Sequence, residues 1–493
     1  MYKRKSLSVN ITANLINQVS AALFPIVTFP YVSRVLQPEG LGRVSFAAAI
    51  VRYFAVLAAL GIPLYGVRES AKRREDKTAL STLAVELFSL NAIMTVMVLL
   101  AFGAFMLLSR KAGSDPTLFW ICALPMLLTP LGFNWLFRGM EEYVYITLRT
   151  LVIRVLALVA IFLFVRTHQD FRIYALIVAL NAMGASVLNV LFVRRHISVR
   201  RVDWRRVNVW RHVRPALLTF SLRSVVSIYT SLNIVMLGYM TDDTQVGYYS
   251  AANRAVKVVV MLVTSMGVVL LPRVSYYIES EKLDEYRRLM AITLRLITFV
   301  SFPATAGLII LANPLMLLLS GHAFEPAVPL VQIMGMDILW ISLGNFVGYQ
   351  VLYSQGKEKL LLYSVVFGAL CNLGLNLLLI PRWHAVGAAL STLVAETCVT
   401  GARIIFSRSY SNFKWPVWSM LKYATTALSM AGVVVFLRSF LAESVLLLLI
   451  CIGAGVTFYV IVMWLLKDSM LSAIWSRLTA GAAAVGKADS AGI

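Results

Sequence analysis

Long apolar runs follow one another along almost the whole chain, separated by short polar segments. A helix that crosses a bilayer needs about 20 mostly apolar residues, and the pattern predicts about fourteen such spans. The connecting segments are too short to bury a core of their own. We therefore expect an all-α polytopic membrane protein and not an enzyme. The predicted spans are 11–33, 43–66, 82–108, 116–137, 146–166, 171–193, 215–238, 246–272, 290–312, 327–352, 360–380, 384–403, 417–437 and 444–466.

Composition and charge support this interpretation. The 493 residues are 59% hydrophobic and 14% charged, whereas soluble chains carry roughly 25% charged residues. With the N-terminus inside, the cytoplasmic segments hold about 30 basic residues and the outer loops about 8. By the positive-inside rule this bias places both termini in the cytoplasm. Topology thus explains most of the net charge of +22.

The segment 194–214 concentrates eight arginines together with Trp204 and Trp210. Such a basic segment could be read as a nucleic-acid contact. An amphipathic segment lying on anionic lipid is the interpretation we favour, because interleaved Arg and Trp suit the headgroup layer. We expect no nucleic-acid partner.

No sequence motif here indicates a catalytic site. The four cysteines and five histidines are scattered, which gives no pattern for a metal centre, a haem or a disulfide framework. A nucleophile elbow, a phosphate-binding glycine loop and a loop with paired acids are also missing from the sequence. Transport or lipid handling is favoured, with no cofactor beyond Na⁺ or H⁺ as a coupling ion.

Two stretches 205 positions apart share their spacing. Gly42 opens the second predicted span and Gly247 the eighth, and Arg52 and Lys257 occupy the same offset within those spans. Two six-helix halves of the same orientation would produce this shift of six spans, and their binding site would lie between them near the membrane midplane. The matches are few, so chance is the alternative. Spans 13 and 14 would then lie outside the two repeated halves.

Several motifs carry a family resemblance: Tyr31 to Gly42 (YVSRVLQPEGLG), Gly61-Ile62-Pro63, Tyr65 to Glu69 (YGVRE), Gly139 to Tyr143 (GMEEY), Asn372, Asn376, Ile380-Pro381 and Val386 to Ala389 (VGAA), ending near Glu396. Together they resemble Wzx-type polysaccharide flippases of the multidrug/oligosaccharidyl-lipid/polysaccharide exporter superfamily. The resemblance covers spans 1–12 and implies two six-helix lobes around a central cavity. The expected organisation is an N-lobe at 1–195, a basic linker at 196–214, a C-lobe at 215–406, two further helices at 407–466 and a cytoplasmic tail at 467–493.

Four cations lie well inside predicted spans, where a charge costs several kcal/mol, about 2.5–3.5 on insertion scales. Deep acids are fewer, namely Asp337 and Glu396, with Glu86 nearer the cytoplasmic end. The excess of cations predicts an anion-binding cavity suited to pyrophosphate, and lipid II flippases of the same superfamily also carry arginines in helices 2 and 8. In the alternative, the cations pair with Asp337 or Glu396 or reach the surface. The predicted headgroup ligands are Arg52, Arg223, Arg254 and Lys257.

A second set of polar residues is similar to the sodium site of a lipid II flippase, with a backbone carbonyl near Ala388 as a further ligand. This chain departs from that pattern by having Asn at two positions where acids are expected. The alternative is that these groups hydrogen-bond across helices, and proton coupling through Glu396 or Asp337 is a third possibility. The set consists of Asn233, Asn372, Asn376 and Thr392.

The resemblance implies an inner-membrane flippase that moves undecaprenyl-pyrophosphate-linked oligosaccharides to the outer leaflet by alternating access, for O-antigen, capsule or exopolysaccharide assembly. The expected partners are this cargo, membrane lipid, and a polysaccharide polymerase with its chain-length protein. One alternative is an ion-coupled multidrug exporter of the same superfamily, although an exporter of cationic drugs should show acids in its cavity. A membrane glycosyltransferase is a further alternative, but it needs catalytic acids on a substantial loop.

Overall fold

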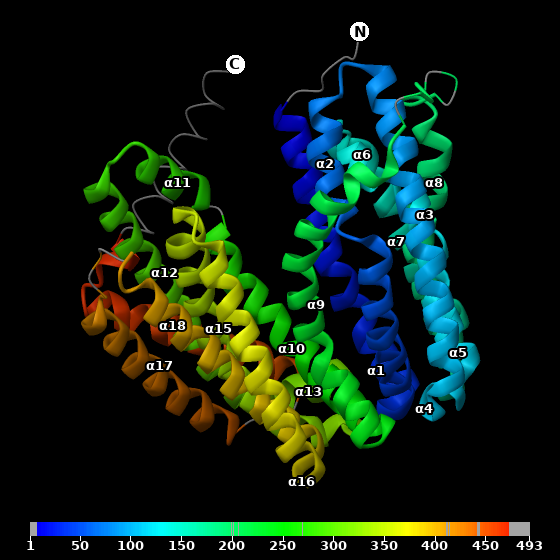
Figure 1. The fold of residues 1–493 in the computed structure, drawn as a ribbon. Coiled ribbons are helices and arrows are strands. Elements are labelled where there is room, and N and C mark those ends of the chain that lie inside the picture. The colour runs from blue at the N-terminus through cyan, green and yellow to red at the C-terminus, as the bar shows by residue number, and fades with distance from the viewer. Residues whose placement is uncertain are drawn as a thin grey trace, which may run out of the picture. The chain divides into compact units, whose positions relative to one another are not determined.

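The computed structural model describes residues 7–472 except 199, 201, 206, 269, 411–412, 414 and 441–443. These residues form helices and turns, and no strand occurs among them. Packing divides the chain into two compact units, Met1–Ser250 and Ala251–Ile493 (Figure 1). The predicted all-α class is therefore confirmed.

The first unit begins with α1, a helical pair in one continuous segment. Its two arms meet at Gln37, where a positive φ of 61° breaks the helix and the chain reverses (Figure 1). Pro38 follows, and a residue before proline is disfavoured in the helical conformation. The arms pack against α3, α5, α7 and α9. The helices of this unit are α1 (Leu7–Ala59), α2 (Ile62–Lys72), α3 (Lys77–Leu108), α4 (Arg110–Gly113), α5 (Pro116–Leu127), α6 (Asn134–Gly139), α7 (Tyr143–Phe164), α8 (Phe171–Val193) and α9 (Val213–Met240).

The second unit contains a similar reversal inside α16. His384 has a φ of 49°, and the arms on either side of it lie against each other, since a Cβ on Gly368 would meet the side chain of Val399. A Cβ on Gly387 would lie 2.4 Å from the carbonyl oxygen of Leu379, which shows how closely the arms approach. The chain enters this unit within α10 (Asp243–Val268) and continues through α11 (Leu271–Glu279), α12 (Leu283–Ile310), α13 (Ala312–Ser320), α14 (Val328–Gly335), α15 (Asp337–Asn345), α16 (Glu358–Ser407), α17 (Val417–Arg438) and α18 (Val445–Leu465).

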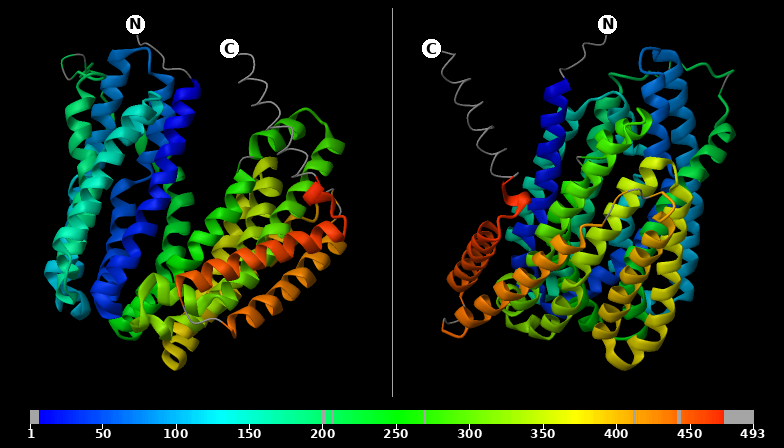
Figure 2. Two further views of the ribbon diagram at one scale, coloured as in Figure 1. Left: turned by 180° about the vertical axis from the view of Figure 1, so that it is seen from behind. Right: turned by 90° about the vertical axis from the view of Figure 1, so that its left-hand side faces the viewer.

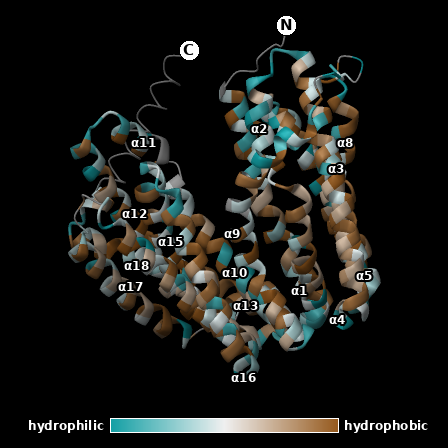
Figure 3. Ribbon diagram, viewed as in Figure 1, coloured by the Kyte–Doolittle hydropathy of each residue, from teal (hydrophilic) through white to brown (hydrophobic). Residues whose placement is uncertain are grey.

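Nine helical stretches among the described residues are long and apolar enough to cross a membrane, or ten if α5 and α6 form one bent span. Two of them, which contain α1 and α16, each hold two of the predicted spans. Predicted spans 215–238 and 246–272 fall mainly on α9 and α10, which are not among these stretches. A multi-pass membrane protein is confirmed, and the count of fourteen stays a prediction. Along α3 and α5 the ribbon is largely hydrophobic, whereas α2, α4 and α11 carry hydrophilic residues (Figure 3).

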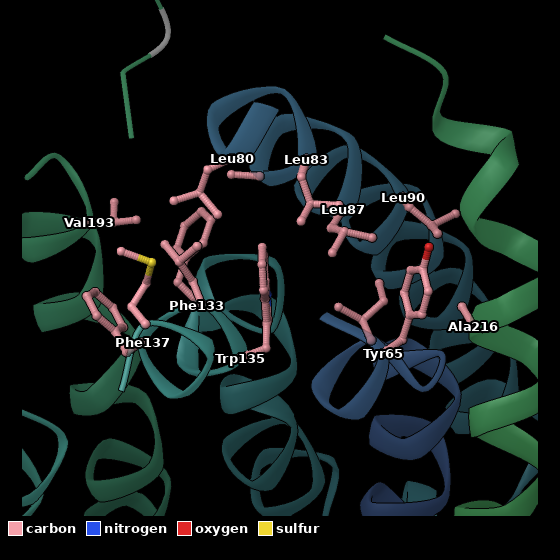
Figure 4. Close-up of a cluster of buried hydrophobic side chains, with 14 of the residues drawn as sticks. Tyr65, Leu80, Leu83, Leu87, Leu90, Phe133, Trp135, Phe137, Val193 and Ala216 are labelled. Atoms are coloured by element: carbon pink, nitrogen blue, oxygen red, sulfur yellow. The ribbon is translucent and has the colours of Figure 1, made fainter. Parts of the chain in front are cut away.

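Each unit has its own hydrophobic core. In the first, side chains from α2, α3 and α6 meet Val193 of α8 and Ala216 of α9 (Figure 4). In the second, α17 and α18 run side by side and pack with α12 around the fully buried ring of Tyr423 (Figure 2). Helices 13 and 14 of the prediction are thus part of the second unit.

The predicted lobe boundary is not tested by this division. The packing groups α9 with the first unit, whereas the sequence assigned 215–406 to a C-lobe. The predicted linker 196–214 also belongs to the first unit, and residues 473–493 of the predicted tail lie outside the described residues.

Candidate functional site

Arg52 lies in the second arm of α1, and its side chain is exposed between the buried Val51 and the half-buried Tyr53. Among the described residues it forms no ion pair. Tyr53 donates its hydroxyl to the carbonyl oxygen of Ile228 in α9 at 3.2 Å, which ties this part of α1 to α9. Arg52 is thus an uncompensated cation on an apolar helix.

The other predicted cations lie on α9 and α10. Arg254 is half-buried and Lys257 is exposed, and their spacing of three places them on one face of α10. Both take part in interactions with other groups. Arg223 is on α9, but its side chain lies outside the described residues. Arg52 belongs to the first unit and Arg254 and Lys257 to the second, so a shared cationic chamber stays a prediction.

The two deep acids of the second unit lie near each other. Asp337 begins α15 and is only 1% exposed, and the charge of Glu396 on α16 acts on it repulsively. Within the described structure Asp337 forms no ion pair, and its Oδ1 atom has no hydrogen-bond partner. Asp337 therefore does not neutralise any of the predicted cations here. Instead, the buried carboxyl group of Asp337 lies near the half-buried Glu396.

The predicted cation ligands are divided between the units. Asn233 donates to the hydroxyl of Tyr249 at 2.7 Å in the first unit. In the second unit Asn376 donates to Oδ1 of Asn372 at 3.0 Å, and Thr392 donates to the carbonyl of Ala388, one turn back, at 2.8 Å. Of these three contacts, the first joins α9 to α10, and the other two each lie within one arm of α16. A four-residue sodium site joining both units stays a prediction.

The structure gives Glu86 a role that the sequence did not reveal. Its fully buried carboxylate accepts hydrogen bonds from the backbone of Asn208 at 2.7 Å and from Nε2 of His212 at 2.8 Å, and it pairs with Arg211 at 2.5 Å. A carboxylate only accepts, so Nε2 carries the proton and Nδ1 of a neutral His212 accepts from the hydroxyl of Tyr65 at 2.8 Å. We call this set the linker anchor. Its linker members lie more than 120 positions from Glu86 and Tyr65 along the chain, so no local motif predicts it.

Burial governs the protonation of His212. The imidazole is 1% exposed, and this burial holds its pKa below the ordinary value of 6.5, although the Glu86 carboxylate opposes the shift. Neutral His212 is thus the form that the linker anchor favours at neutral pH.

The basic linker follows the N-terminal part of α3. Backbone N–H groups of Ser198 and Asp203 donate to the hydroxyls of Ser81 and Thr82 at 3.1 and 3.2 Å. Trp204 and Trp210 nevertheless remain 63% and 72% exposed. The linker backbone is therefore docked on α3, while its tryptophans stay available to a lipid headgroup layer.

At the opposite end of the first unit, the start of the second arm of α1 lies directly against the start of α10. A Cβ on Gly42 would be 1.7 Å from the carbonyl oxygen of Asp243, and one on Gly247 would be 1.9 Å from that of Pro38. Arg43 pairs with Asp243 at 3.6 Å across this contact. The two glycines aligned by the sequence repeat thus meet in a backbone approach that only glycine allows.

No group of three or more His, Cys, Asp or Glu side chains within the described part of the chain could hold a metal ion. The predicted site residues are hydrogen-bonding and charged groups on helices that are otherwise largely apolar. Their chemistry is suited to binding and releasing a charged ligand.

Comparison with known proteins gives two kinds of similarity. The family model described as "Polysaccharide biosynthesis protein" matches residues 7–278, and the MatE model matches residues 215–378. The chain is also 25% identical over 407 residues to a candidate O-antigen transporter from Escherichia coli (strain K12), covering 82% of this chain and 97% of that protein.

Two solved structures share the fold. A lipid II flippase, MurJ, in an inward closed conformation matches with a TM-score of 0.60 at 16% identity, over 92% of this chain and 99% of that one. A multidrug resistance MATE family transporter of the MOP superfamily, in an inward-facing conformation, matches with a TM-score of 0.61 at 13% identity, over 82% and 94%. The chain therefore has the fold of these transporters.

Proposed function

Because the chain belongs to the polysaccharide biosynthesis protein family, we propose that it is a flippase for undecaprenyl-pyrophosphate-linked oligosaccharides. It moves them from the cytoplasmic to the outer leaflet of a bacterial inner membrane, with both of its termini in the cytoplasm. The E. coli relative that bears the name of an O-antigen transporter supports this cargo class. Its relatives and structural neighbours are transporters and not catalysts.

The observation that carries the proposal is the uncompensated Arg52. A cation on an apolar helix is costly, so it is retained where it meets an anion or water. Guanidinium groups bind phosphate oxygens in a bidentate manner, and lysine adds a compact charge. The pyrophosphate binds to four cations while the polyprenyl tail stays in lipid. These cations are Arg52, Arg223, Arg254 and Lys257. A polysaccharide polymerase and its chain-length protein receive the product.

Coupling to a proton gradient is favoured over coupling to sodium. Asn372 and Asn376 bond to each other and offer no carboxylate, whereas Asp337 is a buried carboxyl group beside Glu396. A proton on this pair removes the repulsion between two carboxylates, so loading and release of one proton changes the energy of the second unit. We expect a pH gradient to accelerate translocation by the wild type but not by Asp337→Asn. Acceleration by a sodium gradient, retained in Asp337→Asn, would contradict this mechanism.

The multidrug exporter alternative has one specific observation in its favour. The MatE model matches residues 215–378. Asp337 lies within that stretch, and Glu396 lies after its end. An exporter of organic cations would use these acids as ligands, and would have no need of Arg52.

A translocation assay separates the two functions. The wild type and an Arg52→Ala/Lys257→Ala variant are reconstituted in proteoliposomes with a fluorescent undecaprenyl-pyrophosphate oligosaccharide. Two charge-assisted hydrogen-bonding contacts are worth about 3–6 kcal/mol together, so the variant should be slower by at least about a hundredfold. An Arg110→Ala/Lys359→Ala variant, which removes two exposed cations at other positions, is the matched control and should translocate normally.

Two results would overturn the proposal. Wild-type rates in the Arg52→Ala/Lys257→Ala variant would make these cations structural. A folded wild-type protein that moves no cargo above empty liposomes, but exports an organic cation, would establish the exporter function instead.

A further inference from the structure

A groove of about 560 Å³ lies between α7 and α8, on helices that carry none of the cations proposed for the cargo. It is formed near the start of α7 and the end of α8, and the basic linker follows α8 directly. The positive-inside rule assigns this end to the cytoplasm. The groove belongs entirely to the first unit.

Arg149 lies at the bottom of this groove and is 6% exposed. Its guanidinium donates to Oδ1 of Asn134 at 3.0 Å, to the carbonyl of Ala185 at 3.4 Å and to Oδ1 of Asn189. All three acceptors are neutral, and the buried Nε atom has no hydrogen-bond partner. Within the described structure no carboxylate pairs with Arg149. A buried charge is normally paired, so the groove has an unneutralised positive floor.

A second cation lies at the mouth of the groove. Arg195 is exposed, and its guanidinium carbon lies 4.2 Å from the ring centroid of Phe192. Phe192 in turn stacks on Tyr145, with centroids 4.1 Å apart, and the guanidinium carbon of Arg149 lies 5.4 Å from the Tyr145 centroid. Each ring of the aromatic pair therefore contacts one of the two arginines. Glu142 also lines the groove, and its charge acts on the neighbouring His196.

The walls of the groove are apolar and open to the surroundings. Leu148, Val152 and Leu191 line it and are 64%, 49% and 62% exposed. Exposed aliphatic side chains on membrane helices face acyl chains. A ligand with an anionic group and a hydrocarbon chain would neutralise the arginines and cover the apolar walls of the groove.

We infer that this groove binds an anionic phospholipid of the cytoplasmic leaflet, with the phosphate on the exposed Arg195, the buried charge of Arg149 within the same groove, and an acyl chain along Leu148, Val152 and Leu191. Basic pockets between membrane helices on the cytoplasmic side suit such headgroups. Charge complementarity selects the anionic lipid over a zwitterionic one, and the apolar walls select a lipid over free phosphate. This site is separate from the proposed cargo site, and its occupancy does not require transport.

Photo-crosslinking tests this assignment on the full chain in nanodiscs. Phosphatidylglycerol carrying a diazirine on one acyl chain is activated, and the labelled positions are mapped by peptide mass spectrometry. We expect labelling of the α7 and α8 segments to fall about fivefold in Arg195→Gln, since an interfacial arginine contributes about 1 kcal/mol. Arg194→Gln removes the same charge from an exposed neighbour outside the groove and should leave labelling unchanged.

Competition distinguishes the possible ligands. Unlabelled phosphatidylglycerol should displace the probe, while glycerol 3-phosphate at the same concentration should not. Equal labelling by a phosphatidylcholine probe, or an equal loss in Arg194→Gln and Arg195→Gln, would overturn the proposal. Displacement by undecaprenyl pyrophosphate at far lower concentration would make the groove a cargo site and would also overturn it. Arg149→Lys, which keeps the charge, should retain labelling if it folds, and Arg195→Gln decides the question in any case.

Discussion

Gly42→Ala tests the contact between α1 and α10 in the first unit. The new Cβ would lie 1.7 Å from the carbonyl oxygen of Asp243, whereas ordinary van der Waals contact begins near 3.4 Å. The two backbones must therefore separate by the difference, about 1.7 Å. No flexible side chain can move aside, because the obstructing atoms are backbone. Overpacking of this kind costs about 1–3 kcal/mol, and the rigidity of the contact places the cost near the upper end.

Thermal unfolding in detergent measures this cost. A loss of about 3 kcal/mol should lower the Tm by about 6–12 °C if the first unit, of roughly 250 residues, unfolds cooperatively. Gly103→Ala is the matched control, since a Cβ there meets nothing within 4 Å and alanine has the higher helix propensity. The control should therefore unfold at or slightly above the wild-type temperature.

Equal Tm values for Gly42→Ala and Gly103→Ala would refute the reasoning. Gly247→Ala provides an independent check, because its Cβ would be 1.9 Å from the carbonyl oxygen of Pro38. If the close approach is the cause, the two substitutions should destabilise to a similar extent. Their effects should also fall short of additivity in the double variant, because residues in contact are coupled.

Two further predictions concern the linker and the C-terminal helices. His212 has a pKa below 6.5 in the folded protein, so the undocked chain binds more protons below pH 6.5 and the docked linker loses stability as the pH falls. Trypsin should therefore cleave the linker faster at pH 5.5 than at pH 7.5. Equal cleavage rates, after correction for the pH dependence of trypsin itself, would contradict the effect of burial. Asp468 accepts a hydrogen bond from Tyr423 at 3.2 Å and forms an ion pair with Lys422. Asp468→Ala should therefore lower the free energy of unfolding by about 1.5–3 kcal/mol, which is more than Tyr423→Phe should lower it. Equal losses for the two variants in thermal unfolding would show that the ion pair adds nothing.

Local sequence patterns were sufficient for the membrane character and the helical class. Membrane insertion depends on the hydropathy of about 20 consecutive residues, which any single segment displays on its own. The reversals inside α1 and α16 were also predictable, since the separate spans 11–33 and 43–66, and 360–380 and 384–403, required a turn between them. The family, too, follows from motifs along the chain.

The polar interactions needed the tertiary structure. The partners of Glu86 lie between 122 and 126 positions away, and those of Arg149 are 15, 36 and 40 positions away on other elements. Arg149 counted in the sequence only as one basic residue near a span end. The sequence could list the cations and acids within the predicted spans, but it could not tell that Asp337 lies beside another acid. Charge pairing depends on which helix faces pack together, and hydropathy does not encode this, because one apolar surface packs nearly as well against many others.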